Sequence, residues 1–532
     1  MGKLCFFLLS VVLLVFLLNG ETATASSRKK VATGARTHDG SEEWGYVEVR
    51  PKAHMFWWLY RSPNRVEDSS KPWPIILWLQ GGPGGSGVGM GNFEEIGPLD
   101  TYLKPRNSTW LQVADLLFVD NPVGTGYSFV EEGDADLFVK TDDEAATDLT
   151  TLLEKVLNRN ESLQKSPLYI VAESYGGKFA VTLGLSALKA IEAGKLKLKL
   201  GVLTSHRFQL SWGPLLRDLS RLDNNGLEKA KSLAEKISQQ IREGQYADAT
   251  NSWSKLEEVI SANSNSVDFY NFLLDSGSDP VSLSTAAAEL SQKSAMKSYT
   301  RYISSLRSLP AGGGGVGDLD SIMNGVIKRK LKIIPANFSC VSFLLKWGEQ
   351  SGTVFNQLEG DFMRPRINEV DELLAKGVSV TIYSGQLDLI CSTKGTEAWV
   401  EKLKWEGLSK FLGMNRTPLF CGAEQQKLTR GFTKSYKNLN FYWILGAGHF
   451  VPVDQPCIAL KMVGQITQSP AAEAAASAKQ DQKSKHEKRK VCSEERGEKT
   501  TIAQHKNAAA QRAENGSKRQ SKGSFSSVMR YS

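Results

Sequence analysis

The chain has 532 residues, of which 41% are hydrophobic, and a formal net charge of +8. Fourteen Lys and Arg against seven Asp and Glu lie from Ser469 onward, so this stretch carries +7 and the remainder about +1. The nearly neutral body excludes the basic surface that nucleic-acid binding requires. The length allows one large α/β domain with insertions, or two to three ordinary domains.

The first 25 residues have the pattern of a secretory signal peptide. Lys3 precedes an apolar run over residues 4–18, and small residues at 23–25 fit a cleavage site. The run is shorter than the roughly 20 residues of a membrane span, and no later stretch is apolar enough for one. The sequence predicts a secreted protein, extracellular or vacuolar/lysosomal, without a membrane span. A signal anchor is the alternative.

Export permits glycosylation and disulfide bonds. Sequons occur at Asn107, Asn160, Asn337 and Asn415, with another at Asn515 in the basic C-terminal stretch. Outside the signal and that stretch the cysteines are Cys340, Cys391, Cys421 and Cys457. Four cysteines allow three pairings, and their spacing does not select one.

Apolar patterns predict a large sheet covered by helices. Residues 43–49 and 54–60 alternate as paired antiparallel strands do. Continuous apolar runs, typical of strands buried on both faces, follow at residues 74–79, 116–119, 168–171, 378–383 and 439–445. Helical spacing occurs over residues 141–157 and 178–191. Strands that alternate with helices indicate an α/β fold with a mostly parallel sheet.

Two regions depart from this alternation. Between about residues 212 and 335 the pattern is helical, and one helix face carries Leu227, Leu233, Ala234, Ile237 and Ile241. We expect a helical insertion that caps the sheet, within a domain over residues 26–468. Residues 469–532 are dominated by Ala, Lys, Gln, Glu and Ser, and this composition predicts a disordered tail.

A serine stands at the turn between the strand predicted at 168–171 and the following helix. Ser174 is flanked at both two-residue offsets by small residues, Ala172 and Gly176. Strand, sharp turn and helix with small flanks are the setting of a nucleophile elbow. Ala172 replaces the glycine that is usual at the first flank.

The general base and its acid are predicted by elimination and position. His38 and His54 precede the core of the sheet, and two further histidines lie in the tail, which leaves His206 and His449. His449 lies in a glycine-rich turn after a buried strand, where an imidazole can reach the serine. Asp388 lies in the loop after the strand predicted at 378–383. The order Ser174, Asp388, His449 is that of α/β-hydrolases.

The loop over residues 80–87 is rich in glycine, and Gly82, Gly84 and Gly87 satisfy G-x-G-x-x-G. A dinucleotide site is not supported, because no helix follows directly and Pro83 interrupts the turn. We predict that this loop supplies a backbone N–H to an oxyanion, beside the N–H of Tyr175. The sequence predicts no cofactor and no metal.

The motifs together resemble the serine carboxypeptidase family, most closely its retinoid-inducible and plant serine carboxypeptidase-like branch. They are WLQGGPG, FVDNPVGTG, ESY, SGQLD and GHFVP, at residues 78–84, 118–126, 173–175, 384–388 and 448–452. The resemblance spans about residues 44–465 and implies an α/β-hydrolase fold with a helical cap. It implies Ser174, Asp388 and His449 as catalytic triad, and Gly82 and Tyr175 as oxyanion donors.

The resemblance also implies how a substrate is held. Family members bind the free C-terminal carboxylate of a peptide, and the corresponding positions here are Gln80, Gly81, Glu95 and Glu173. Gln80 stands where asparagine is usual. Crowded acids that share protons predict substrate binding, and cleavage, at mildly acidic pH, provided that the imidazole stays neutral there. Cys391 matches a cysteine that some members keep as a free thiol, for which packing is favoured over catalysis.

Three segments depart from the family pattern: residues 203–210, the apolar stretch 338–346 and the tail. If His206 and Arg207 fall on a buried strand, the unpaired charge costs several kcal/mol. We therefore expect a secreted serine-type carboxypeptidase that is poorly secreted or weakly active. The alternatives are an acyltransferase with the same triad, as in some plant relatives, and a catalytically impaired variant.

Overall fold

The computed structural model describes residues 33–66, 71–131, 134–204, 211–275, 318–332, 346–421, 428–472 and 503–512. The predicted signal peptide, Asn337, the residues 338–345 and most of the predicted tail lie outside the described residues. His206 and Arg207 lie outside them as well.

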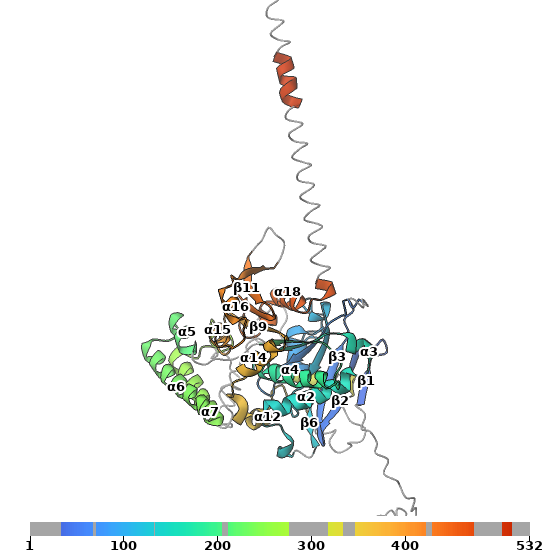
Figure 1. Cartoon of the computed structure of the whole chain (residues 1–532), viewed down its shortest axis with the longest axis vertical. Helices are drawn as coiled ribbons and strands as arrows, with labels where there is room; N and C mark the ends of the chain where they lie inside the picture. The colour runs from blue at the N-terminus through green and yellow to red at the C-terminus, as the bar shows by residue number, and fades with distance from the viewer. Residues whose placement is uncertain are drawn as a thin grey trace, which may run out of the picture.

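One twelve-stranded sheet forms the centre of the described structure (Figure 1). In spatial order its strands are β1 (Thr33–Arg36), β2 (Glu42–Arg50), β3 (Ala53–Tyr60), β5 (Asp115–Val119), β4 (Ile75–Leu79), β7 (Leu168–Ala172), β8 (Leu200–Thr204), β9 (Ser379–Gly385), β12 (Leu439–Ile444), β11 (Thr429–Tyr436) and β10 (Thr417–Phe420), with β6 (Phe129–Val130) paired to β3. The six strands from β5 to β12 are parallel, and the strands at both edges are antiparallel. The predicted α/β class with a mostly parallel sheet is confirmed.

The central strands are buried because helices cover them. Every residue of β4 and β5 is buried, as their continuous apolar sequences predicted. Helix α2 (Asp142–Leu157) begins at the side chain of Thr141, which accepts the Glu144 N–H, and its acidic first turn suits the helix dipole. Helix α4 (Gly176–Glu192) packs against α2 and the central strands, and the two lie together over the sheet in Figure 1.

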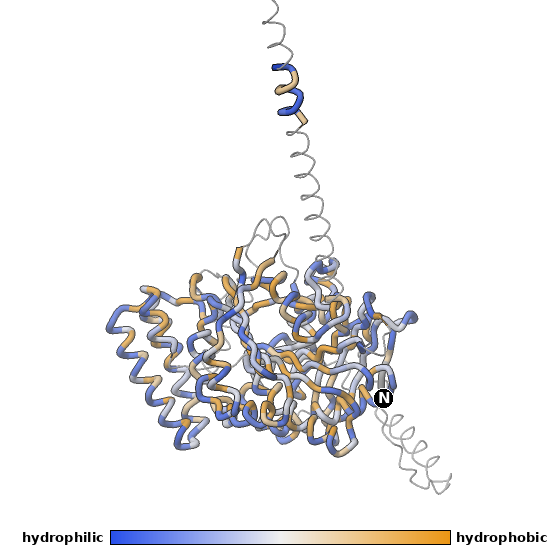
Figure 2. The backbone as a smooth tube through the Cα atoms, turned by 45° about the horizontal axis from the view of Figure 1, so that its top comes forward, coloured by the Kyte–Doolittle hydropathy of each residue, from blue (hydrophilic) through white to orange (hydrophobic). Residues whose placement is uncertain are grey.

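Helices between residues 212 and 332 lie within the predicted insertion, and α5, α6 and α7 stand at one side of the sheet (Figure 1). On α6, Ala234 and Ile237 are buried while Leu233 and Ile241 are half-buried, as the helical spacing predicted. Figure 2 shows hydrophilic and hydrophobic residues alternating along these helices. The helices of this region are α5 (Trp212–Asp218), α6 (Asn224–Arg242), α7 (Tyr246–Ser264), α10 (Leu319–Ile322), η6 (Met323–Ile327) and α11 (Lys328–Leu331).

Shorter helices complete the described body. They are η2 (Trp110–Gln112), η4 (Ala135–Leu137), α3 (Glu161–Lys165), α12 (Gly352–Gln357), α13 (Glu359–Phe362), α14 (Ile367–Ala375), α15 (Thr393–Val400), α16 (Leu408–Gly413), α17 (Val451–Asp454) and α18 (Pro456–Ile466). Among the described residues, no helix combines the length and the apolar character that a membrane crossing requires.

One premise of the sequence analysis is wrong: a helix does follow the glycine-rich loop directly. The π-helix η1 spans Gly87–Ile96. Helix propensity does not predict η1, because its sequence is rich in glycine, which disfavours a helix. They are needed for packing, since a Cβ on Gly89 would lie 2.2 Å from the Trp347 ring and one on Gly91 would lie 2.2 Å from Trp78 Nε1. Two buried tryptophans therefore stabilise a helix that the local sequence does not favour.

Strand β8 ends within the segment 203–210 that departs from the family pattern, and packed residues are present just past residue 468. Strand β8 pairs with β7 and β9 and ends at Thr204, two residues before His206. The buried Ser469 and the packed Ala472 show that the folded body continues past residue 468. Residues 503–512 form a helix, and all ten are exposed.

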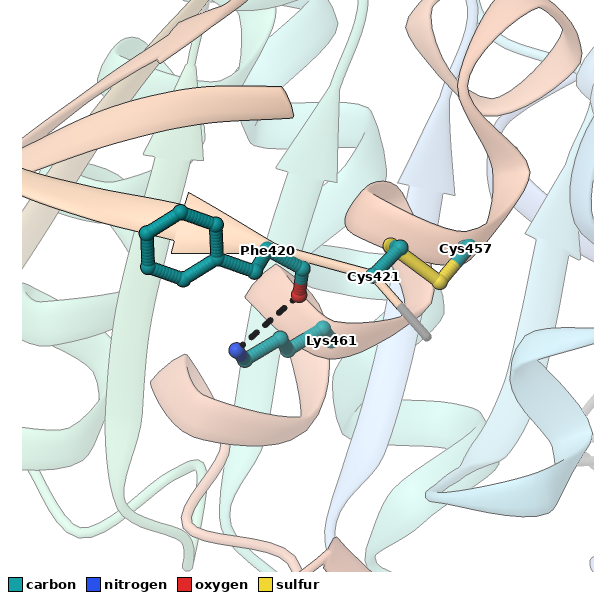
Figure 3. The surroundings of a disulfide bond; sticks show 4 residues. All are labelled: Phe420, Cys421, Cys457 and Lys461. Atoms are coloured by element: carbon teal, nitrogen blue, oxygen red, sulfur yellow. Dashed lines mark hydrogen bonds between the residues drawn. A yellow bond between two sulfur atoms is a disulfide. The ribbon is translucent and has the colours of Figure 1, made fainter. Parts of the chain in front are cut away.

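A disulfide joins Cys421, which directly follows β10, to Cys457 in the first turn of α18 (Figure 3). Beside it, the Lys461 ammonium donates to the Phe420 carbonyl at 3.2 Å, which ties the same two elements together. This is one of the pairs that the sequence left open. Cys391 is a free, buried thiol, and Cys340 lies outside the described residues.

Candidate active site

Ser174 adopts the strained backbone of a nucleophile elbow. It follows β7, precedes α4 and has φ +58°, a left-handed conformation that a serine adopts at a cost of roughly 1–3 kcal/mol. The turn needs small neighbours, because a Cβ on Gly176 would lie 2.3 Å from the Leu79 carbonyl oxygen. Ala172, the unusual flank, is fully buried and accommodated. The sequence prediction of strand, turn and helix is thus met at this position.

His449 and Asp388 form a buried pair. Asp388 lies in the loop after β9 and His449 in the loop after β12, and the two strands are parallel neighbours. His449 Nδ1 lies 2.8 Å from Asp388 Oδ2, and the Cys391 N–H donates to Asp388 Oδ1 at 2.9 Å. A carboxylate at Nδ1 fixes the proton on that nitrogen and leaves Nε2 to act as a base. Among the described residues, Nε2 makes no hydrogen bond.

The protonation of His449 is set by two opposing effects. Burial is the largest single effect and would lower the pKa of His449, but the charges and hydrogen bonds of Asp388 and Cys391 together outweigh it, so the pKa lies well above its ordinary 6.5. This direction is opposite to the neutral imidazole that the sequence analysis required in mild acid.

A segment from the insertion lies between the loops that carry this pair. The Tyr270 carbonyl accepts the His449 backbone N–H at 2.8 Å, and the Phe272 N–H donates to the Leu387 carbonyl at 3.0 Å. The Tyr270 ring also meets the His449 ring edge-on, with centroids 4.9 Å apart. Gly448 permits this approach, because a Cβ there would lie 2.3 Å from the Tyr270 carbonyl oxygen. Sequence reasoning missed these residues, since nothing local relates the insertion to the catalytic loops.

Gln80 holds two buried carboxyl groups beside the elbow. Gln80 Nε2 donates to Glu95 Oε1 at 3.1 Å and to Glu173 Oε1 at 2.9 Å. The Trp78 indole N–H donates to Gln80 Oε1 at 2.7 Å, which fixes the orientation of the amide. Gln80 therefore makes both contacts although asparagine is usual at this position. Glu95 comes from η1, and Glu173 directly precedes Ser174.

This acid pair retains a proton near neutral pH. Burial raises the pKa of Glu95 from its ordinary 4.5 to about 7, although its hydrogen bonds to Glu173 and Gln80 oppose the shift. Burial, reinforced by the charge of Glu95, raises the pKa of Glu173 well above its ordinary value. Two carboxyl groups in one desolvated site cannot both ionise easily, so they hold a proton between them.

The glycine-rich loop lies directly against the elbow. A Cβ on Gly81 would lie 2.6 Å from Ser174 Cβ and 2.9 Å from the Tyr175 nitrogen. Gly82 has φ +114°, and Gln350 Nε2 donates to the Pro83 carbonyl at 2.7 Å, which holds the loop from outside. Glycine at 81 thus keeps open the space in front of the Tyr175 N–H. The role of Gln350 carries no signal in the sequence.

Asp388, Cys391 and His449 bring one ligand atom each to within 4.8 Å of one another. Among the described residues, this is the set whose side chains could hold a metal ion. The Asp388 and His449 side chains already bond to each other, so a metal would have to displace that pair.

The three described sequons at Asn107, Asn160 and Asn415 are all exposed.

A serine turn after one parallel strand, with acid and base on loops after later strands of the same sheet, defines an α/β-hydrolase. The protein-family model described as "Serine carboxypeptidase" matches residues 34–469, and the chain belongs to the serine carboxypeptidase family. The predicted resemblance is confirmed.

The chain covers almost the whole length of two relatives. Serine carboxypeptidase-like 51 from Arabidopsis thaliana is 61% identical over 471 residues, 87% of this chain and 98% of that protein. The retinoid-inducible serine carboxypeptidase from Mus musculus is 44% identical over 473 residues, 87% of this chain and 98% of that protein. The crystal structure of KEX1(delta)p, a prohormone-processing carboxypeptidase from Saccharomyces cerevisiae, matches with a TM-score of 0.61 at 20% identity, covering 80% of this chain and 91% of that one. This match supports the fold.

Proposed function

We propose that the chain is an exported serine carboxypeptidase that releases the C-terminal residue of a peptide through an acyl-enzyme on Ser174. The family and its named relatives support the class of reaction. The observation that carries the proposal is the acid pair of Glu95 and Glu173 on Gln80, directly beside the strained serine. A protonated carboxyl pair can donate to a carboxylate, which an ionised pair would repel.

In the proposed reaction, Ser174 Oγ attacks the last peptide carbonyl carbon while His449 Nε2 takes its proton. Asp388 Oδ2 accepts the Nδ1–H and stabilises the imidazolium. The carbonyl oxygen becomes an oxyanion and receives hydrogen bonds from the N–H groups of Tyr175 and Gly82. When the C–N bond breaks, His449 returns the proton to the leaving amine. A water molecule, deprotonated by His449, then hydrolyses the ester and frees Ser174.

Substrate selection follows from the carboxylate site. The free C-terminal carboxylate receives hydrogen bonds from the Gly81 N–H and the protonated acid pair, which Gln80 holds in place because its two Nε2 hydrogens are donated to Glu95 and Glu173. Binding should weaken once the pair loses its proton, near the pKa of about 7 for Glu95. The raised pKa of His449 opposes an optimum far into acid, because the base must be neutral to act. The acid pair favours a pH below about 7 and the neutral base favours a pH above the ordinary value of histidine, so we expect activity to fall on both sides of a maximum near neutral pH.

Export is part of the proposal. The N-terminal pattern and the exposed sequons at Asn107, Asn160 and Asn415 support it. The bond between Cys421 and Cys457 supports it too, because disulfides persist in oxidising compartments such as the secretory pathway. Extracellular or vacuolar/lysosomal delivery both fit these features.

Substrate assays and active-site labelling of the secreted chain test the proposal. A blocked dipeptide should be cleaved, while an acyl-glucose donor with an acceptor should give no acyl transfer. A fluorophosphonate should label the chain, and Ser174→Ala should abolish labelling while the protein stays folded. Undiminished labelling of Ser174→Ala would refute the assignment of the nucleophile. Acyl transfer without peptide cleavage would favour the acyltransferase, and neither activity would indicate an impaired variant.

A further inference from the structure

Behind the elbow, the side chain of Tyr175 enters a buried cluster of charges that the proposed reaction does not use. The Tyr175 hydroxyl donates to Asp142 Oδ1 at 2.8 Å, and Lys178 Nζ donates to the same hydroxyl at 3.2 Å. Tyr175, Asp142 and Lys178 are each at most 3% exposed. The residue that supplies an oxyanion N–H is thus anchored at its far end by two charged groups.

The cluster joins three separate parts of the chain. Asp142 opens α2, Lys178 lies in the first turn of α4, and Asp361 and Arg366 flank the turn between α13 and α14. Arg366 donates to Asp142 Oδ2 at 3.0 Å and to Asp361 Oδ2 at 2.8 Å, and Lys178 Nζ lies 3.1 Å from Asp142 Oδ2. Each buried charge is thus paired with one of opposite sign, as buried charges require, and Arg366 also donates to Asp143 and Glu369.

The ring of Tyr175 is held as firmly as its hydroxyl. Phe362 stacks on it with centroids 5.3 Å apart and an interplanar angle of 9°. Lys178 Nζ lies 4.6 Å from the ring centroid, and the Phe179 ring meets it edge-on at 5.0 Å. The backbone just before this residue is strained at Ser174, so it keeps its conformation only if its surroundings hold it.

We propose that Asp142 and Lys178 are positioning residues for the reaction: through the Tyr175 side chain they hold the Tyr175 N–H where the oxyanion forms. The inference rests on the proposed function, in which that N–H donates to the oxyanion. An oxyanion donor that has shifted stabilises the transition state less than one in place. Removing such a donor altogether lowers kcat by about 100- to 1,000-fold. Loosening Tyr175 should therefore lower kcat without weakening ground-state substrate binding.

The test compares full-length wild type with Tyr175→Phe, which removes the hydroxyl and leaves the four charges paired. We expect kcat on a blocked dipeptide to fall by about 10- to 100-fold with KM unchanged. Affinity for a peptide aldehyde, whose adduct with Ser174 carries the oxyanion, should fall equally. Affinity for the other product, the free amino acid whose carboxylate lies at the acid pair and not at the oxyanion donors, should not change.

The matched control is Tyr127→Phe, which removes a buried tyrosine hydroxyl that donates to the Met323 carbonyl and not to a residue of the charge cluster. It should leave kcat and aldehyde affinity unchanged. Should Tyr175→Phe not be recovered folded, Phe362→Leu removes the stacked ring instead and carries the same expectation.

Wild-type kcat and aldehyde affinity in Tyr175→Phe, with an active wild-type enzyme, would overturn the positioning role and leave the proposed function intact. An equal loss in Tyr127→Phe would also overturn it. A wild-type chain that neither cleaves the dipeptide nor reacts with a fluorophosphonate would overturn the proposed function, and this inference with it.

Discussion

Replacing Glu95 with glutamine should change how the stability of the protein depends on pH. Glutamine keeps the shape of Glu95 and an oxygen that accepts from Gln80 Nε2, but it cannot ionise. The pKa of Glu95 is about 7 in the folded protein and near its ordinary 4.5 when unfolded. Between these values the folded protein binds more protons than the unfolded chain, so its stability falls as pH rises through this window.

The size of the effect follows from the shift. About 2.5 pKa units at 1.36 kcal/mol each give up to about 3 kcal/mol between pH 4.5 and pH 7 or above. Urea unfolding of both proteins at pH 5 and pH 8 measures it. Wild type should lose up to about 3 kcal/mol more than Glu95→Gln over that range.

Glu228 is exposed on α6, and Glu228→Gln provides the matched control. It should show the wild-type dependence on pH, because the change is made on the exposed face of α6 and leaves the acid pair intact. An identical dependence for wild type and Glu95→Gln would refute the claim that the acid pair holds a proton in the folded protein.

Three further predictions concern binding, packing and secretion. KM for a blocked dipeptide should rise with pH above about 7 in wild type and remain flat in Glu173→Gln; a flat KM in both would contradict proton sharing. Gly91→Ala should destabilise the protein by about 1–3 kcal/mol and raise KM, because its Cβ would displace the Trp78 indole that orients Gln80; Gly360→Ala, which has open space around its Cβ, is the control. Replacing residues 203–210 with a typical family segment should raise secretion and fluorophosphonate labelling, and equal values for the two chains would show that the segment is tolerated.

The positions of Ser174, Asp388 and His449 in the fold could be predicted because each residue follows a buried strand of one parallel sheet. Continuous apolar runs identify such strands, and the carboxyl ends of parallel strands meet at one edge. The local sequence around each of these three residues is therefore enough to predict where it lies. The pairing of Gln80 with Glu95 and Glu173 came from the family resemblance, because no local pattern relates η1 to β7.

The parts of the structure that the sequence did not predict depend on contacts between residues that are distant in the sequence. Arg366 bonds to Asp142, which lies 224 positions earlier, and no periodicity records that pairing. Likewise, η1 forms because Trp78 and Trp347 occupy the space that Gly91 and Gly89 leave open. Tertiary packing overrides helix propensity there.

The most direct test of the account compares a blocked dipeptide that ends in a free carboxylate with the same dipeptide as its C-terminal amide. The central claim is that Gln80, Glu95 and Glu173 direct the serine triad to the end of a peptide chain. At pH 5.5 the free acid should be cleaved with a much higher kcat/KM than the amide, and Glu173→Gln should narrow the difference. Equal cleavage of the acid and the amide by the wild-type protein would contradict the claim.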